Sequence, residues 1–322
     1  MTNYIRKLLL LSFIFMACNA QANEPIKIYI NQLIAHPALD KTAQGIMDTL
    51  DEYSKAKSVK IELKLKNAQG DSKLANQISS RFVSNNPDIV VGIATISAQS
   101  LAKYAKSGKT KLVFSTVTDP IAAGLVTKLQ SPGGNITGVS NYIDLEPQLG
   151  LFKNILPSMQ KIGFIYNPGE SNSVIIAEKL DKICQKMKIK LVKITAAKSS
   201  DVPQAAMKLC SEVDAVFISN DNTALSAIKS IIKEANKYKI PVFVSDTDAV
   251  KDGAIAALGP NQYEIGKQTA EIIIQVIEGK NIGQIDVQYP KSNELYLNVK
   301  AAKVIDINFS QELLEKAKNV IY

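Results

Sequence analysis

A run of polar side chains follows directly after an apolar stretch in the second half of the chain. The sequence VFVSDTDAV, residues 242–250, is apolar as far as Val244. The polar run that follows is Ser245, Asp246, Thr247 and Asp248. Carboxylates can hold an ammonium group or act as general acids and bases, and hydroxyls can bind anions or begin a helix. The earlier stretch VFSTVTDP, residues 113–120, ends in a similar way at Asp119. Both stretches are candidates for binding or for catalysis.

Catalysis fits the remaining residue types poorly. His36 is the only histidine, and Pro37 follows it directly. Ser97 or Ser173 could form a hydrolytic triad with His36 and an aspartate, but no G-x-S-x-G motif is present. The sequence also has neither a P-loop nor G-x-G-x-x-G, and one histidine with few cysteines cannot form a standard zinc site. We therefore expect no enzyme, no metal and no cofactor, and expect His36 to begin a helix or to face a cleft.

Strands and helices alternate along the chain from Ile26 onward, which is typical of parallel α/β sheets. From Lys161 the sequence repeats the plan of its first half. The stretch DAVFISNDNTALSAI, residues 214–228, aligns with DIVVGIATISAQSLA, residues 88–102, so Thr95 pairs with Asp221. The repeat is much longer than the period of a solenoid, so it predicts two similar α/β lobes.

The segments after residue 252 are too short to form a third domain. GAIAALG reads as a strand, QYEIGKQTAEIIIQVIEG as a helix, ELYLNVKAAKVIDI as a further strand and SQELLEKAKNVI as a closing helix. We expect these segments to cross between the lobes and to complete each of them.

Polar residues gather after each predicted strand. Ligands of parallel α/β sheets bind outside the carboxyl ends of the strands. Six loops in these places are rich in Ser, Thr, Asn and Asp: 35–40, 94–99, 115–120, 166–173, 219–224 and 245–250. One such loop alone indicates helix capping, but six at the facing edges of two lobes predict a cleft for a small ligand. Helix N-termini and hydroxyls would hold a carboxylate there, and Asp221, Asp246 or Asp248 would hold an ammonium.

The N-terminus has the pattern of a secretory signal. Arg6 and Lys7 precede an apolar run, residues 8–17, that is too short to span a bilayer. Cleavage after Ala22 would leave residues 1–22 as the signal peptide, whereas FMAC allows lipidation at Cys18 instead. We expect a periplasmic protein whose mature chain does not insert into the membrane, with a lipid-anchored form as the alternative.

The basic charge does not indicate a nucleic-acid partner. The formal charge of +8 falls to +6 when Arg6 and Lys7 are removed, and the lysines are spread over amphipathic helices without an arginine-rich run. Cys184 and Cys210 each lie on an apolar helical face, so a disulfide in an oxidising compartment and two buried thiols are both open.

Several of these motifs, in this order, resemble those of a known family. The matching stretches include AHPALDKTAQGIMDTL, GIATISAQ, FSTVTDPIAAGLV, PGGNITGVS, DNTALSAI and PVFVSDTDAVKDGAIAALG. Together they resemble the ABC transporter substrate-binding protein family that includes tryptophan- and tyrosine-binding proteins, over residues 26–305. The resemblance implies a type I periplasmic binding protein fold, in which two doubly wound α/β lobes are joined by three crossover strands. It places the N-terminal lobe at 24–139 and 257–281 and the C-terminal lobe at 143–252 and 284–322.

The resemblance also implies a set of ligand-binding residues in the cleft. They are Thr95, Ser97, Ala98, Thr116, Asp119, Asn172, Ser173, Asp221, Asn222, Asp246 and Thr247. Pro168 and Gly169 depart from the family pattern, so we expect a less constrained loop there. The implied ligand is an amino acid, with tryptophan, tyrosine or phenylalanine favoured, and Tyr142 is a candidate stacking surface.

The resemblance implies transport. It indicates a monomer that closes on its ligand by a hinge and delivers the ligand to an ABC transporter permease. The main alternative is an extracytoplasmic sensor that signals rather than transports. A secreted hydrolase that uses His36 or Ser97 is a third hypothesis.

Overall fold

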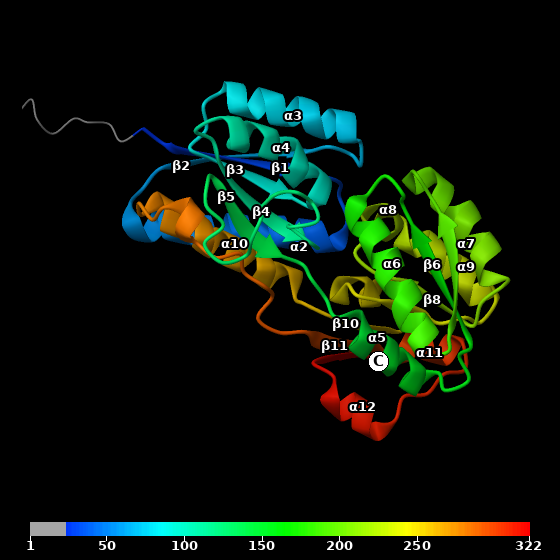
Figure 1. Ribbon diagram of the computed structural model, residues 1–322. Helices are drawn as coiled ribbons and strands as arrows, with labels where there is room; N and C mark the ends of the chain where they lie inside the picture. The colour runs from blue at the N-terminus through cyan, green and yellow to red at the C-terminus, as the bar shows by residue number, and fades with distance from the viewer. Residues whose placement is uncertain (1–23) are drawn as a thin grey trace, which may run out of the picture.

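The protein consists of two α/β lobes that lie side by side (Figure 1). The computed structural model describes residues 24–322. The first sheet has five parallel strands in the order β2-β1-β3-β4-β5. Their bounds are β1 Ile26–Gln32, β2 Ile61–Asn67, β3 Ile89–Ile93, β4 Lys111–Val117 and β5 Ile136–Ser140. Strands β3 and β5 are buried along their whole length, because helices cover both faces of this sheet.

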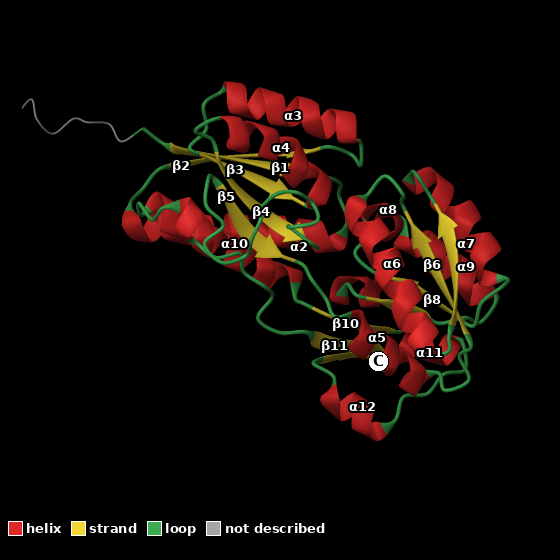
Figure 2. Cartoon of the chain, in the orientation of Figure 1, coloured by secondary structure: helices red, strands yellow, loops and turns green. Residues whose placement is uncertain are grey.

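Two pairs of helices sandwich the first sheet (Figure 2). They are α2 (Pro37–Lys57) with α10 (Gln262–Ile277), and α3 (Ser72–Ser84) with α4 (Thr95–Ser107). Although α10 comes from the second half of the chain, it packs closely along α2. A Cβ at Gly45 would lie 2.2 Å from the carbonyl oxygen of Tyr263, and one at Gly266 would lie 2.2 Å from that of Thr42. These glycines allow the two helix backbones to touch.

The second sheet has seven strands in the order β12-β11-β10-β9-β8-β6-β7. Its bounds are β6 Lys161–Tyr166, β7 Lys190–Thr195, β8 Ala215–Ile218, β9 Val242–Val244, β10 Ala256–Gly259, β11 Glu294–Asn298 and β12 Asn319–Ile321. The order β7-β6-β8-β9 repeats β2-β1-β3-β4 of the first sheet, as the internal repeat predicts. β11 runs antiparallel to β10, and the other pairs are parallel.

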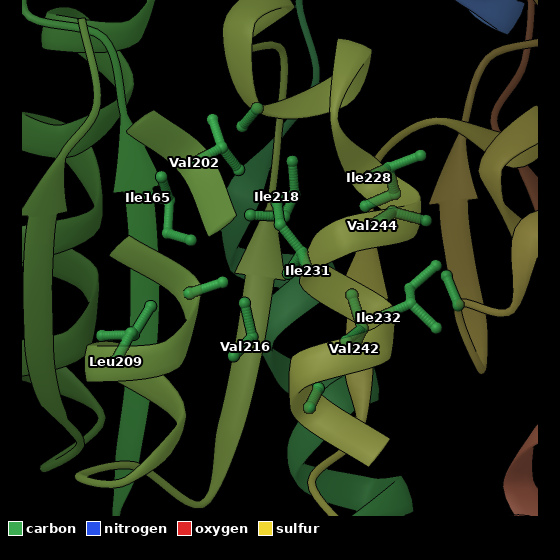
Figure 3. Close-up of a cluster of buried hydrophobic side chains, with 14 of the residues drawn as sticks. Ile165, Val202, Leu209, Val216, Ile218, Ile228, Ile231, Ile232, Val242 and Val244 are labelled. Carbon is green, nitrogen blue, oxygen red and sulfur yellow. The ribbon is translucent and has the colours of Figure 1, made fainter. Parts of the chain in front are cut away.

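Helices also cover both faces of the second sheet. One face carries α7 (Val202–Cys210), α8 (Asn222–Ser226) and α9 (Ile228–Lys237), and the other carries α5 (Leu145–Ile155), α6 (Ser171–Lys186), α11 (Val299–Val304) and α12 (Gln311–Lys316). Figure 3 shows the core under α7 and α9, where Ile218 and Val244 from the strands belong to one buried cluster with Leu209 and Ile231 from the helices. Short 3₁₀ helices are η1 (Ser199–Asp201), η2 (Thr247–Asp252) and η3 (Ile282–Gln284).

The chain crosses between the lobes after β5, after β10 and after η3. The expected start of the second part of the N-terminal lobe, residue 257, falls inside β10. Ala257 pairs with Val244 of β9 and with Tyr296 of β11, so residues 257–259 lie in the second sheet and that part of the lobe begins after Gly259. Ladder hydrogen bonds hold β10 in this sheet on both sides.

The structure also tests the expectations for the segment after β11 and for the two cysteines. The stretch VKAAKV was expected to continue a strand, but it forms α11, because the side chain of Asn298 caps that helix by accepting a hydrogen bond from the Ala301 N–H. Cys184 and Cys210 are free thiols that belong to different core clusters. Burial raises the pKa of both thiols to about 11, so they remain protonated.

The predicted signal peptide, 1–22, and the possible lipidation site Cys18 lie outside the described residues. Within residues 24–322, none of the helices combines the length and the apolar character that a membrane span requires.

Candidate functional site

The polar loops at the strand ends bring the two lobes into direct contact. His36 Nε2 of the first lobe lies 3.3 Å from Asn222 Oδ1 of the second, and both side chains are buried. Asn220 Nδ2 of the second lobe donates to the carbonyl oxygen of Asn141 in the first crossover, at 2.8 Å. At the rim, Lys179 Nζ lies 4.0 Å from Asp119 Oδ2. The lobes are therefore closed on each other in this structure.

Three helices that begin at this interface lack a side-chain cap. The N-cap residues of α2, α4 and α6 are His36, Ala94 and Glu170, and none of these side chains accepts a hydrogen bond from the first turn of its own helix. By contrast, Asp221 caps α8 and Asp246 caps η2. Uncapped N–H groups at a helix start attract anions, so α4, which is 13 residues long, offers a place for a carboxylate.

The first lobe carries backbone strain at this edge. Ala94 has φ 73° and ψ 159°, a region that glycine adopts almost alone, and Thr116 has φ 54°, which is rare for a β-branched residue. The two residues are joined, because Ala94 N–H lies 3.2 Å from Thr116 Oγ1. Thr95, Ser97 and Ala98 follow in the first turns of α4 and are buried. The structure thus brings together four of the five residues expected in the first lobe.

Asp119, the fifth, lies at the edge of this group. Its Oδ1 accepts the Ala122 N–H at 3.0 Å, and its side chain remains partly exposed beside Lys179. Lys179 Nζ also lies 4.8 Å from the centre of the Tyr142 ring, and Tyr142 meets Tyr289 edge to face. An open pocket of about 400 Å³ is lined here by Thr118, Asp119, Pro120, Ile121, Leu129, Tyr142 and Tyr289.

A buried glutamate organises the second lobe. The carboxylate of Glu170 accepts hydrogen bonds from the backbone N–H of Asn222 at 3.2 Å and of Thr223 at 3.0 Å, at the start of α8. The Thr223 hydroxyl donates to it at 2.8 Å and Asn222 Nδ2 at 2.5 Å. Glu170 therefore fills the anion-binding position at the start of α8, so a ligand carboxylate is excluded from it.

The other residues expected in the second lobe surround this carboxylate. Asp221 is fully buried and accepts the N–H groups of Asn167 and Ala224. Burial and then the charge of Glu170 raise the pKa of Asp221. Asn172 Nδ2 donates to the carbonyl oxygen of Asn220 at 2.6 Å and lies 3.3 Å from the Ser173 hydroxyl. Asn172, Ser173, Asp221 and Asn222 thus form one cluster.

Asp246 and Thr247 lie where η2 meets α2 of the first lobe. Asp246 Oδ1 accepts the Asp248 N–H at 3.0 Å. Burial, and then the charge of Asp248, raise the pKa of Asp246 to about 7. Asp248 instead pairs with Lys251 at 3.1 Å and is more exposed. Asp246 and Asp248 therefore differ: Asp246 is buried at the interface, and Asp248 forms an ion pair nearer the surface.

Buried polar atoms without a hydrogen-bond partner gather at this interface. Six such side-chain atoms occur in the described part of the chain, and four of them belong to interface residues: His36 Nδ1, Asn172 Oδ1, Asp246 Oδ2 and Gln262 Oε1. Buried polar groups are nearly always paired in folded proteins, so these atoms make the interface the candidate ligand site. Among residues 24–322, buried acids include Glu170, Asp221 and Asp246, whereas no lysine or arginine is buried. The buried charged side chains are therefore all acidic, which suits a group that carries hydrogen-bond donors and positive charge.

Two of these residues could have been found from the sequence only in part. His36 was expected to begin a helix or to face a cleft, and it does both, yet it was absent from the predicted ligand set. Glu170 was missed, because it stands in the loop with Pro168 and Gly169 that departs from the family pattern. Its hydrogen-bond partners come from α8, more than fifty residues later, and no local sequence signal predicts that contact.

Among residues 24–322, no group of three or more His, Cys, Asp or Glu side chains suits a metal ion.

Two α/β lobes with repeated strand order, three crossovers and a ligand site at the facing strand ends define a type I periplasmic binding protein fold. The family model described as "ABC transporter substrate binding protein" matches residues 27–321. The chain belongs to this family. It is 35% identical over 280 residues to the tyrosine-binding protein of Clostridioides difficile strain R20291. The matched region covers 87% of this chain and 81% of that protein.

Two solved structures allow the arrangement of the lobes to be compared with a ligand-bound and an open protein. One is the ABC domain in complex with L-Trp from Streptococcus pneumonia, at 30% identity and a TM-score of 0.87, with 92% of this chain and all of that chain covered. The other is the ligand-free, open structure of a substrate-binding protein with adhesive properties from Clostridium difficile, at 29% identity, 92% and 99% coverage, and a TM-score of 0.67. The two identities differ by one percentage point, yet the overall shape is closer to that of the ligand-bound protein, which agrees with the contacts between the lobes.

Proposed function

We propose that this protein is an extracytoplasmic amino-acid receptor that binds an aromatic amino acid between its lobes and delivers it to an ABC transporter permease. The observation that carries the proposal is the set of buried, unpartnered polar atoms at the interface. Membership of the substrate-binding family and the tyrosine and tryptophan named for its relatives support the choice of ligand.

The two ends of an amino acid match the two sides of the site. The uncapped N-terminus of α4, with Thr95 and Ser97 in its first turn, suits the carboxylate. The second lobe suits the ammonium, because Glu170 already occupies the start of α8 and Asp246 Oδ2 lacks a partner. A ligand that contacts both lobes stabilises the closed state, which a permease can recognise.

The aromatic preference has its own structural support. Tyr142 and Tyr289 form an aromatic pair with ring centres 6.3 Å apart beside the pocket of about 400 Å³ at the crossovers. An aromatic side chain can stack on such a surface. The protein acts as a monomer in this proposal, exported by the signal at 1–22 or anchored at Cys18, and it needs no cofactor or nucleic-acid partner.

Titration calorimetry tests the proposal. Protein stripped of ligand by unfolding and refolding is titrated with each of the twenty amino acids and with myo-inositol as a non-amino-acid control. Binding of tryptophan, tyrosine or phenylalanine with the highest affinity is the expected result. The proposal is overturned when none of the amino acids binds to refolded protein.

A further inference from the structure

A chain of three buried side chains crosses the interface from the second lobe to the first. Glu170 accepts from Asn222 Nδ2 at 2.5 Å, and Asn222 Oδ1 lies 3.3 Å from His36 Nε2. The relative exposures are 1%, 7% and 5%, so water does not compete for these hydrogen bonds. These hydrogen bonds determine which ring nitrogen of His36 donates and which accepts.

The carboxylate at one end sets the orientation of the asparagine. Glu170 already accepts the Asn222 and Thr223 backbone N–H groups, so an amide rotated by 180° would place Asn222 Oδ1 against a carboxylate oxygen. Repulsion between two buried acceptors excludes that orientation. Asn222 therefore offers an acceptor, not a donor, toward His36.

The asparagine in turn sets the tautomer of the histidine. Burial lowers the pKa of His36 to about 4, so the imidazole is neutral at neutral pH and carries a single ring N–H. That N–H must be on Nε2, because Nε2 faces the acceptor Asn222 Oδ1. Nδ1 is then an acceptor, it is buried, and it has no partner.

We propose that His36 Nδ1 accepts a hydrogen bond from the ammonium of the ligand, and that Glu170, acting through Asn222, is the positioning residue that keeps Nδ1 free of a proton. This inference rests on the proposed amino-acid function and adds a ligand contact to it. Asn172 Oδ1 and Asp246 Oδ2 are also unpartnered acceptors, and a primary ammonium has three donors. His36 belongs to the first lobe and lies against Asn222 of the second, so a ligand ammonium bound to His36 Nδ1 adds a first-lobe contact beside the interface.

The shape of the histidine ring provides a matched pair of variants. In His36→Gln the Gln Nε2 can replace His Nε2 and keep the bond to Asn222, but no acceptor remains at the δ position. In His36→Asn the Asn Oδ1 can replace Nδ1, but the bond between the lobes is lost. A ligand contact predicts that His36→Gln loses more affinity, by about 10- to 100-fold, because a buried ammonium N–H loses its acceptor. A role limited to holding the lobes together predicts the reverse order.

Nitrogen NMR of the wild-type protein tests the tautomer without any substitution. His36 is the only histidine in the chain, so its two ring nitrogens give a single set of signals in ¹⁵N-labelled protein. We expect a protonated Nε2 and an unprotonated Nδ1 in the closed, ligand-bound protein, where Nε2 faces Asn222, and a change in the Nδ1 shift when the amino acid identified by calorimetry is added to ligand-free protein. A protonated Nδ1, an Nδ1 shift that ligand leaves unchanged, or stronger binding by His36→Gln than by His36→Asn overturns the inference. Absence of amino-acid binding by the wild type overturns the proposed function itself.

Discussion

Burial without a partner is the property that His36, Asn172 and Asp246 share. Each has a polar atom that is shielded from water and lacks a hydrogen bond in the closed structure. Leaving such atoms unpaired costs about 1–3 kcal/mol each, so a ligand that pairs them recovers this free energy on binding. At the scale of single residues, affinity should therefore respond to these atoms much more than to neighbouring surface charges.

Asp246→Asn tests the carboxylate of the opening motif. The substitution removes the negative charge but keeps the shape of the side chain, and we expect the free energy of amino-acid binding to weaken by about 1–3 kcal/mol. Asp248→Asn is the matched control when both are measured at pH 8, above the pKa of Asp246, because Asp248 pairs with Lys251 and shows no unpartnered buried atom. Calorimetry measures both. Equal affinity of Asp246→Asn and wild-type protein would show that Asp246 only caps η2 and does not bind the ligand.

The raised pKa of Asp246 also predicts how the affinity for the amino acid depends on pH. In the closed structure the pKa of Asp246 is raised to about 7, first by burial and then by Asp248, so below that pH the carboxyl becomes protonated when the lobes close unless an ammonium pairs with it. Only the ionised form pairs with an ammonium. Affinity should therefore rise by up to about tenfold per pH unit as the pH approaches 7 and level off above it. Titrations between pH 5 and 8 measure this, and the slope should flatten in Asp246→Asn.

The stability of the closed form without a ligand ammonium should change with pH in the opposite direction. An acid whose pKa is higher in the folded than in the unfolded chain binds more protons when folded, so folding is favoured at low pH and stability is lost as the pH rises through about 7. Asp221 contributes in the same direction, because its pKa is also raised. Urea unfolding of Asp246→Asn should depend less steeply on pH, and an unchanged slope would contradict the assignment to Asp246.

At the scale of elements, the close contact of α2 with α10 connects distant parts of the chain. α10 is contributed by residues 262–277, yet it completes the first lobe by packing on α2. This helix also carries Gln262, whose Oε1 is one of the unpartnered interface atoms. The helix that completes the core of the first lobe thus begins at the interface between the lobes.

Gly266→Ala should destabilise the protein by about 1–3 kcal/mol, because the added Cβ would lie 2.2 Å from the carbonyl oxygen of Thr42 and the two helix backbones would have to separate. Gly150→Ala is the matched control. Its added Cβ would meet nothing within 4 Å, so the better helix propensity of alanine should stabilise by about 0.5–1 kcal/mol. Urea unfolding measures both variants, and equal effects would show that the helices adjust without cost.

At the scale of the whole molecule, the contacts between the lobes couple ligand binding to closure of the lobes. His36 with Asn222, Asn220 with Asn141 and Lys179 with Asp119 cross the interface or its rim. The few hydrogen bonds are small beside the hydrophobic core of each lobe, so the lobes can separate without unfolding. The similarity to a tryptophan-bound structure, greater than to an open ligand-free one, fits this interpretation.

Small-angle scattering should therefore detect closure. Ligand-free protein is expected to have a larger radius of gyration than the closed structure, and adding the amino acid identified by calorimetry should reduce it to the closed value. A desamino analogue of the same acid serves as the control, since it lacks the ammonium that contacts His36 beside the interface. An unchanged radius on saturation with the amino acid would show that binding does not require hinge closure.

The sequence by itself determined the local and repeating features of this protein. Apolar strands followed by polar loops, and the match of residues 214–228 to 88–102, predicted two α/β lobes with their ligand loops at facing edges, and the topology agrees. Such features follow from side-chain periodicity and from the position of each loop after its strand. They also identified Asp246 as a residue of interest.

Only the tertiary structure decided which polar groups are satisfied and which are left for a ligand. Glu170 bonds to residues 222 and 223, and this contact is what leaves His36 Nδ1 as an acceptor across the interface. Asp246 and Asp248 look alike in the sequence, yet one is buried with a bare oxygen and the other meets Lys251. The physical reason is that burial and pairing depend on segments that are far apart in the chain and meet only when both lobes have folded and closed.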